Sequence, residues 1–266
     1  MSATPDPKQR FAGRVESYVK HRPSYPRAVI HLLQAECGLT DASVVADVGS
    51  GTGILSRLFL DNGNRVFGVE PNPEMRAAVE EILGDQTRFT SVEGSAEDTT
   101  LPNHSVDFVV AGQAFHWFDA ERTREEFARV LGPEGWAVLV WNLRRKDATP
   151  FLAAYEQLLQ TYRTDRGEIE IWRQDAEMAD SLFGPGSFER ATFDNEQVLD
   201  LDGLKGRLLS VSYVPARDEP GSEAMLREAE RIFSEHQTNG TVTIEYDTEV
   251  YYGRLMPKPA NHRSVG

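Results

Sequence analysis

One short stretch has the residue types and the spacing best suited to chemistry. An acidic residue and three glycines occupy alternate positions there, namely Asp47, Gly49, Gly51 and Gly53. An apolar, β-branched run from Val44 precedes them, and apolar residues recur at helical spacing from Ile54 onwards. A strand, a glycine-rich turn and a helix in this order are typical of a nucleotide-binding unit. The glycines let the backbone approach a ligand, and the helix N-terminus offers it unpaired N–H groups.

The spacing of the glycines separates this turn from a dinucleotide site. A dinucleotide fingerprint reads G-x-G-x-x-G and binds a pyrophosphate, whereas this turn reads G-x-G-x-G with Asp47 two residues ahead of it. A carboxylate there would repel a pyrophosphate and would suit an ammonium or sulfonium group. The segment resembles the first motif, D/E-x-G-x-G-x-G, of the class I S-adenosylmethionine (SAM) methyltransferases. The resemblance implies SAM as the cofactor and S-adenosyl-L-homocysteine (SAH) as its product.

A second acidic residue, Glu70, ends the next strand-like run, 17 positions after Gly53. An acid at this place accepts hydrogen bonds from ribose hydroxyls, a feature that NAD enzymes share, so it indicates a ribose and not a particular cofactor. We expect Pro71, Asn72 and Met75 to lie beside the cofactor as well. Met75 would cover the adenine or else belong to the core.

Two later segments extend the resemblance. Gly94-Ser95-Ala96-Glu97, followed by Leu101-Pro102, is similar to a methyltransferase motif, which implies that Ser95, Ala96 and Glu97 edge the adenine; a plain acidic turn is the alternative. The loop after the strand 106–113 faces the ligand crevice of a doubly wound sheet, which places Gln113 near the cofactor. The run 114–118 resembles small-molecule methyltransferases of the trans-aconitate methyltransferase-like group, which carry the methyltransferase type 11 domain. The run lacks the D/N-P-P-Y/F motif that nucleic-acid amine methyltransferases carry at this place.

The same resemblance supplies the candidates for the acceptor side. It implies that Tyr18 and Arg22, in an N-terminal lid, lie near the SAM carboxylate and the substrate mouth; alternatively the tyrosine packs and the arginine is solvated. His116 is the candidate catalytic residue, because an imidazole is the side chain that ordinarily exchanges a proton near neutral pH. The alternative is that His116 orients its loop by hydrogen bonding, with Trp117 packed under it. We place Trp117 at the substrate. Leu204-x-x-Arg207-x-x-Ser210-x-Ser212-Tyr213 also resembles this group.

Composition narrows the class of protein. The chain has 266 residues, 40% of them apolar, and 28 basic against 42 acidic side chains give a net charge of −14. This charge disfavours nucleic acid and anionic membranes as partners. The single cysteine, Cys37, excludes an intrachain disulfide, and no cluster has metal-site spacing. With no apolar signal core or membrane-spanning run, we expect a cytoplasmic protein.

Periodicity predicts an α/β fold with strands and helices in alternation and a C-terminal antiparallel hairpin. The resemblance implies that these elements form a doubly wound, mostly parallel seven-stranded sheet, and that the N-terminal piece is a helical lid. We divide the chain into a lid (1–40), a SAM-binding Rossmann-like core (41–142), a substrate-pocket insertion with the C-terminal strands (143–254) and a tail (255–266). The expected strands are 44–48, 65–70, 88–93, 106–113, 136–141, 188–198 and 241–253. The expected helices are 11–20, 26–36, 54–60, 73–83, 120–131, 150–162, 204–211 and 222–236.

The resemblance implies a SAM-dependent methyltransferase of a small molecule that methylates the oxygen of a carboxylic acid, which is preferred, or of a hydroxyl, by in-line displacement. A carboxylate acceptor needs no general base, whereas a hydroxyl would require one, such as His116. Three alternatives stay open: an NAD-linked oxidoreductase, a SAM-binding protein without turnover, and a methyltransferase of nucleic acid or protein. The acceptor and the oligomeric state cannot be read from the residues.

Overall fold

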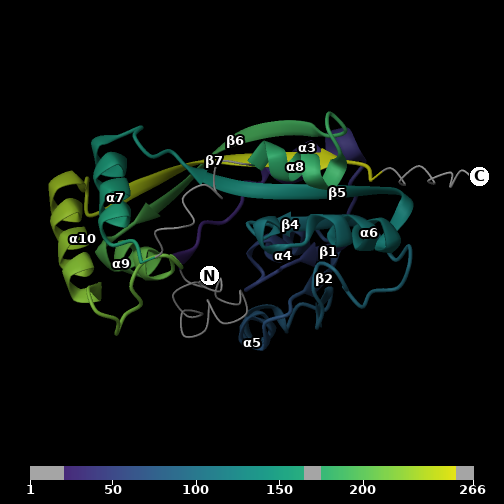
Figure 1. Cartoon of the computed structure of the whole chain (residues 1–266), viewed down its shortest axis with the longest axis horizontal. Helices are drawn as coiled ribbons and strands as arrows, with labels where there is room; N and C mark the ends of the chain where they lie inside the picture. Colours follow the sequence, from purple (N-terminus) through teal and green to yellow (C-terminus); the bar gives the residue numbers. More distant parts are fainter. Residues whose placement is uncertain (1–20, 165–174, 256–266) are drawn as a thin grey trace, which may run out of the picture.

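A seven-stranded sheet runs through the part of the chain that the computed structural model describes, residues 21–164 and 175–255. The strands lie in the order β3-β2-β1-β4-β5-β7-β6 (Figure 1). The first five pair in parallel, and β7 pairs antiparallel with β5 and β6, so the predicted fold is confirmed. The strands are β1 (Val44–Val48), β2 (Arg65–Val69), β3 (Phe89–Val92), β4 (Val106–Gly112), β5 (Leu131–Arg144), β6 (Glu189–Leu199) and β7 (Val242–Gly253).

Helices cover both faces of the sheet and one of its ends. Helices α7, α9 and α10 gather at that end, where the long strands β5, β6 and β7 extend beyond the parallel part (Figure 1). No described helix is long and apolar enough to span a membrane. The helices are α3 (Ala28–Cys37), α4 (Ile54–Asp61), α5 (Pro73–Leu83), the 3-10 turn η1 (Phe115–Trp117), α6 (Ala120–Val130), α7 (Pro150–Thr161), α8 (Asp175–Phe183), α9 (Leu201–Leu209) and α10 (Ser222–His236).

Two buried cores lie on opposite faces of the sheet. On β4, Phe108 and Val110 belong to the core under α3 and α4, whereas Val109 and Ala111 belong to the core under α6 and α8. Alternate side chains of a strand point to opposite faces, so a strand covered by helices on both sides is apolar throughout. A third buried cluster holds α7, α9 and α10 against the far ends of β6 and β7.

The strand order places the ends of β1 and β4 at the crevice of the sheet. The chain runs outward from β1 to β2 and β3 on one side, and continues through β4 and β5 on the other. In open α/β sheets ligands bind at this switch point, outside the carboxyl ends of the strands. The glycine turn after β1 and the loop after β4 therefore face the same space.

Several element boundaries differ from the sequence-based expectation. Strand β5 runs to Arg144 and not to residue 141, because it pairs with β7 from Ala137 through Arg144. Helix α6 ends at Val130 and not at residue 131, and β5 begins at Leu131 and not at residue 136, because Leu131 already pairs with β4. Helix α9 begins earlier than expected, at Leu201, because the Asp200 side chain caps it.

The predicted domain division stays a prediction. The expected helix 11–20 lies outside the described residues, whereas α3, the second helix assigned to the lid, packs onto the sheet. Its Val29, Ile30 and Leu33 are buried in the core that β1 and α4 share. The predicted terminal hairpin has a long connection, because α9 and α10 lie between β6 and β7 in the chain.

Candidate active site

The three glycines after β1 share a positive φ but differ in what surrounds them. All have positive φ, between 54° and 83°, which L side chains rarely adopt. A Cβ on Gly49 would lie 2.7 Å from the Cβ of Ala114, and one on Gly53 would lie 2.6 Å from Val79 of α5. A Cβ on Gly51 would meet no heavy atom within 4 Å. Gly49 and Gly53 therefore allow close packing, and Gly51 faces open space.

Asp47 lies at the base of this turn and is 1% exposed. Its Oδ2 accepts a 2.6 Å hydrogen bond from the hydroxyl of Ser56 on α4. Its buried Oδ1 has no hydrogen-bond partner among the described residues. Burial raises the pKa of Asp47 to about 7; the Ser56 hydrogen bond opposes this rise and the charge of Glu70 adds to it. A buried carboxylate with one open oxygen suits a cationic ligand group.

Glu70 connects the end of β2 to the glycine turn. Its Oε2 accepts the N–H of Gly51 at 2.9 Å, and its Oε1 accepts the N–H of Asn72, also at 2.9 Å. Burial raises the pKa of Glu70, while these two hydrogen bonds and the charge of Arg76 oppose the rise. Each carboxylate oxygen can accept a further hydrogen bond. The two acids expected at the cofactor thus lie at the same turn.

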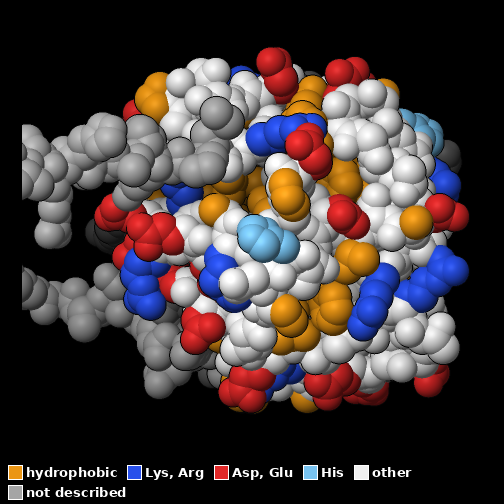
Figure 2. Space-filling view, turned by 90° about the vertical axis from the view of Figure 1, so that its right-hand side faces the viewer, with side chains coloured by type: hydrophobic (Ala, Val, Ile, Leu, Met, Phe, Trp, Pro, Cys, Tyr) orange, Lys and Arg blue, Asp and Glu red, His pale blue; other side chains and the backbone are white. Residues whose placement is uncertain are grey.

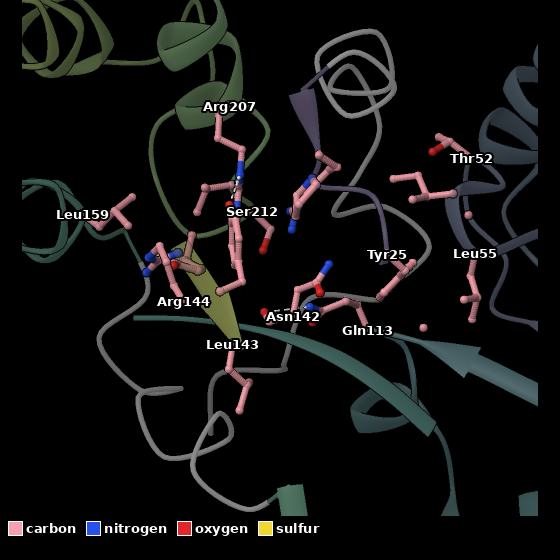
Figure 3. Close-up of a pocket in the computed structure, with 18 of the residues that line it drawn as sticks. Tyr25, Thr52, Leu55, Gln113, Asn142, Leu143, Arg144, Leu159, Arg207 and Ser212 are labelled. Atoms are coloured by element: carbon pink, nitrogen blue, oxygen red, sulfur yellow. Dashed lines mark hydrogen bonds between the residues drawn. The ribbon is translucent and has the colours of Figure 1, made fainter. Parts of the chain in front are cut away.

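A cavity of about 880 Å³ extends from this turn toward α7 and α9 (Figure 3). Thr52 and Leu55 lie on one side of it in Figure 3, and Arg144 and Arg207 lie on the other. Its lining joins the turn after β1, the loop after β4, the end of β5 and segments of α7 and α9. The cavity is therefore built by both the parallel sheet and the helices at its end.

Gln113 and Asn142 lie between the two sides of the cavity in Figure 3. The side-chain amide of Gln113 donates to the backbone carbonyl of Asn142 at 3.0 Å. The side-chain amide of Asn142 in turn donates to the carbonyl of Ser24 at 3.2 Å and its Oδ1 accepts from Thr248 at 2.6 Å. These contacts tie the loop after β4 to β5, to β7 and to the segment that carries Arg22.

The lining of the cavity is rich in basic side chains, although the chain as a whole is acidic. Arg144 pairs with Glu156 of α7 at 2.7 Å. Besides Glu156, Asp47 is the other acid among the lining residues of the described chain. The basic lining residues are Arg22, Arg144, Lys146, Arg163 and Arg207. The cavity therefore offers a positive environment at the end away from Asp47.

Comparisons with known proteins agree with this geometry. A family model described as a methyltransferase domain matches residues 46–139. An uncharacterised methyltransferase-like protein of Schizosaccharomyces pombe is 28% identical over 254 residues, covering 93% of this chain and 96% of that protein. A protein of Anaeromyxobacter dehalogenans whose solved structure is described as a type II methyltransferase is similar with a TM-score of 0.67 and 26% identity, over 89% of this chain and 99% of that one.

This chain is a class I SAM-dependent methyltransferase. Its fold alone is shared with a SAM-dependent methyltransferase from Geobacter sulfurreducens in complex with SAH, at a TM-score of 0.51 and 18% identity, over 95% of this chain and 98% of that one. An uncharacterised methyltransferase of Mycobacterium tuberculosis is 41% identical over 135 residues, which are 50% of this chain and 52% of that protein.

The turn of the methyltransferase fits SAM, its cofactor. Three buried polar atoms around the turn, Asp47 Oδ1, Ser50 Oγ and Thr52 Oγ1, have no partner among the described residues. All three residues line the cavity, and Gly51 leaves space for a ligand beside them. A cation with hydrogen-bonding groups would satisfy these atoms, and SAM carries an ammonium and a sulfonium. The donor set therefore agrees with the cofactor.

The predicted cofactor residues of the methyltransferase fall into two groups. Asp47, Gly49, Gly51 and Gln113 line the cavity. The other predicted cofactor residues are not among the described residues that line the cavity. They are Gly53, Glu70, Pro71, Asn72, Met75, Ser95, Ala96 and Glu97. The predicted ribose and adenine side of the site thus lies beyond the cavity, and its residue roles remain predictions.

The structure also gives local roles to residues of the second group. Asn72 caps α5, because its Oδ1 accepts the N–H groups of Glu74 and Met75 at 2.9 and 3.1 Å. The carboxylate of Glu97 accepts the N–H of Asp119 at 2.9 Å and so anchors the start of α6. Met75 is buried, at 4% exposure. These contacts hold the rim of the site whether or not each side chain touches the cofactor.

The predicted acceptor-side residues of the methyltransferase are only partly brought together. Arg22 lines the cavity and donates to the carbonyl of Ser210 at 2.7 Å. His116 and Trp117 lie in η1 with their ring centroids 4.7 Å apart, and neither is among the described residues that line the cavity. Tyr18 lies outside the described residues. The roles of His116 and Trp117 remain predictions.

Sequence reasoning missed much of the far end of the cavity. Arg144 and Glu156 lie on different elements, and no motif connects them. Arg207 and Tyr213 were noted only as part of a resemblance. The one signal that could have found Arg144 is its place shortly after the apolar run 136–141, at the end of β5.

Proposed function

We propose that this methyltransferase transfers a methyl group from SAM to an oxygen of a small organic acid, with a carboxylate as the acceptor. The observation that supports this proposal is the cavity itself, which begins at the SAM turn and is lined by five basic side chains in a chain of net charge −14. Its volume of about 880 Å³ suits a cofactor end and a small acceptor. Positive side chains attract and hold an anionic acceptor there.

The residues of the chain would bind and align the two reactants. When SAM is bound it supplies an electrophilic methyl group, whose carbon forms a bond to the acceptor oxygen while the carbon–sulfur bond breaks and its electron pair goes to sulfur. Asp47 would hold the cationic part of the cofactor, Glu70 the ribose, and Ser95 to Glu97 the adenine. Gln113 has a second amide hydrogen that could orient the acceptor oxygen. Leu55 and Leu143, which line the cavity, would help to exclude water.

The absence of an obvious base favours a carboxylate over a hydroxyl. A carboxylate is already ionised at neutral pH and loses no proton when it is methylated. A hydroxyl must lose one, and a histidine is the usual acceptor of that proton. No histidine is among the described residues that line the cavity. His116 would act by orienting η1.

The surface offers less support for a polymeric substrate. The face opposite α7, α9 and α10 shows acidic and basic side chains interspersed (Figure 2). Nucleic-acid binding needs a basic stripe or patch, and the net charge of −14 opposes it. We therefore propose a small molecule, of the kind that the trans-aconitate methyltransferase-like group accepts, and no nucleic acid partner.

The test is turnover of methyl-labelled SAM against three pools of small molecules, namely organic acids, alcohols and phenols, and amines. Mass identification of the labelled product then gives the acceptor atom. We expect label in the organic-acid pool, and none from Asp47→Asn at the same SAM concentration. Label confined to the amine pool would contradict the proposal, and label in the alcohol pool would restore a role for a base.

A further inference from the structure

A strap, residues 21–25, forms part of the cavity wall and joins the two sides of the cavity. Arg22 and Tyr25 of the strap line the cavity. The guanidinium of Arg22 donates to the carbonyl of Ser210, at the end of α9, at 2.7 Å. Tyr25 lies beside Leu55 in Figure 3, on the side of the SAM turn. The place of the strap therefore determines part of the wall at both sides.

Each end of the strap fits closely against a glycine. A Cβ on Gly206 of α9 would lie 2.1 Å from the ring of His21, and one on Gly112 of β4 would lie 2.6 Å from the hydroxyl of Tyr25. Neither glycine is among the described residues with positive φ. Gly206 moreover lies within a helix, where glycine is a poor helix former. What these two glycines provide is therefore room for the strap.

Three side-chain amides of the sheet bind the strap between these ends. Asn142 of β5 donates to the backbone carbonyl of Ser24 at 3.2 Å, and Asn195 of β6 donates to the same carbonyl at 2.8 Å. Gln197, two residues further along β6, donates to the backbone carbonyl of His21 at 2.9 Å. The sheet thus holds the strap by two of its carbonyl groups, from strands that are distant in the sequence.

Two hydroxyl groups of β7 fix the direction in which two of these amides face. Thr248, which is fully buried, donates to the Oδ1 of Asn142 at 2.6 Å, and Tyr246 donates to the Oε1 of Gln197 at 3.4 Å. A backbone carbonyl can only accept, so each amide turns its NH₂ group to the strap and its oxygen to the hydroxyl. Each of the two amides therefore connects β7 to the strap by a pair of hydrogen bonds.

We propose that Asn195 and Gln197 are positioning residues for the cofactor. Neither is among the described residues that line the cavity, so they act through the strap and not by contact with SAM. They hold the strap against the sheet, and the strap in turn closes the cavity wall beside the bound cofactor. A strap that leaves the sheet opens this wall, and the cofactor then dissociates faster. The inference concerns the cofactor alone, so methylation of an amine would refute the proposed function and leave this inference intact.

The first test is calorimetry of SAH binding to the full chain that carries Asn195→Ala and Gln197→Ala together. This variant loses the hydrogen bonds of both side chains to the strap, and SAH should bind roughly tenfold more weakly. The loss should lie in faster dissociation, measured by chasing labelled SAH with unlabelled SAH. The stoichiometry of binding should equal that of the wild type, whereas a damaged fold would lower the stoichiometry.

The matched control changes two residues on the other face of the same strand. Thr192→Ala together with Glu196→Ala alters exposed side chains that alternate with Asn195 and Gln197 along β6. The affinity for SAH should remain that of the wild type. A control that weakens binding as much as the test variant overturns the inference, as does a test variant with wild-type affinity. A wild type that does not bind SAH overturns it as well.

A second pair of variants tests the strap itself, and decides the matter if the first variant does not fold. Gly206→Ala places a methyl group where the ring of His21 lies, so SAH binding should weaken, although alanine is the better helix former. Adding His21→Ala removes the ring but keeps the carbonyl that Gln197 binds, so the affinity should return. If Gly206→Ala loses no affinity, or if His21→Ala does not restore it, the inference is overturned.

Discussion

Asp47 and Ser56 form a short buried pair in which one oxygen of the carboxylate is used and the other is open. The hydroxyl of Ser56 donates to Oδ2 at 2.6 Å, and Oδ1 has no partner among the described residues. The pair fixes the orientation of the carboxylate, because Ser56 belongs to α4, the helix that begins after the glycine turn. The open oxygen is thereby held in the wall of the cavity before any ligand binds.

The affinity for SAM should depend on pH through Asp47. Burial raises the pKa of Asp47 to about 7, so its carboxylate is partly protonated in the ligand-free protein near neutrality. A cationic ligand binds the ionised form, and its Kd should fall up to about tenfold per unit as the pH rises toward 7 and level off above it. Calorimetry between pH 5.5 and about 8 measures this. In Asp47→Asn, affinity should be weaker and should lack this dependence; an identical profile in the variant would rule Asp47 out as its source.

The stability of the ligand-free protein should change with pH in the opposite sense. The folded state raises the pKa of Asp47 from 3.8 to about 7, so the folded state binds the proton more tightly than the unfolded state. The contribution of protonated Asp47 to the free energy of unfolding is complete below the pKa that this residue has in the unfolded chain. It is lost as the pH rises through the pKa of the folded state. The unfolding temperature of Asp47→Asn minus that of the wild type should therefore increase between pH 5 and about 8. A constant difference over that range would mean that Asp47 has an ordinary pKa.

Two glycines of the turn should respond differently to the same substitution. Gly51→Ala adds a methyl group to open space in the cavity wall, whereas Gly53→Ala forces one to within 2.6 Å of Val79. Both changes strain a residue with positive φ by roughly 1–2 kcal/mol. We expect Gly51→Ala to lose SAM binding with a modest loss of stability, and Gly53→Ala to lose much more stability. Chemical denaturation and SAM titration of both variants check this, and equal losses of stability would contradict it.

Glu70→Gln should weaken SAM binding roughly 10–100-fold, because charge-assisted hydrogen bonds to the ribose are lost. Through its single side-chain oxygen, the glutamine can accept the N–H of Gly51 or that of Asn72, but not both as Glu70 does. The matched control is Glu93→Gln, a change at a side chain that is 81% exposed. Equilibrium SAM titrations compare the three proteins. Equal affinities of wild type and Glu70→Gln would remove Glu70 from the proposed ribose site.

The parallel half of the fold could be predicted because local patterns and burial agree there. Strands β1, β2 and β4 are apolar on both faces and end at turn residues, so their limits are visible in the sequence. The glycine turn adds a spacing that differs from that of a dinucleotide site. The residues that line the start of the cavity, Asp47, Gly49 and Gly51, were found for this reason.

The far end of the cavity could not be predicted because its residues meet only through tertiary structure. Arg144 is brought to Glu156 by the extension of β5 along β7, and that pairing continues where the apolar pattern has stopped. The burial of Arg207 depends on tertiary contacts, among them the hydrogen bond from its Nε to the hydroxyl of Tyr246 of β7. A basic residue in a helix pattern ordinarily faces solvent. His116 shows the reverse case. Its residue type suggested a catalytic role, but its side chain is not in the cavity lining of the described chain.

The most direct test of the account is the alkali stability of the methyl group after turnover with labelled SAM and the organic-acid pool. If a carboxylate is the acceptor, the product is a methyl ester, and mild alkali should release the label as methanol. Methyl groups on amines, thioethers, ordinary ethers or carbon stay attached under the same conditions. Quantitative release is the result predicted here, and label that survives the treatment would contradict it.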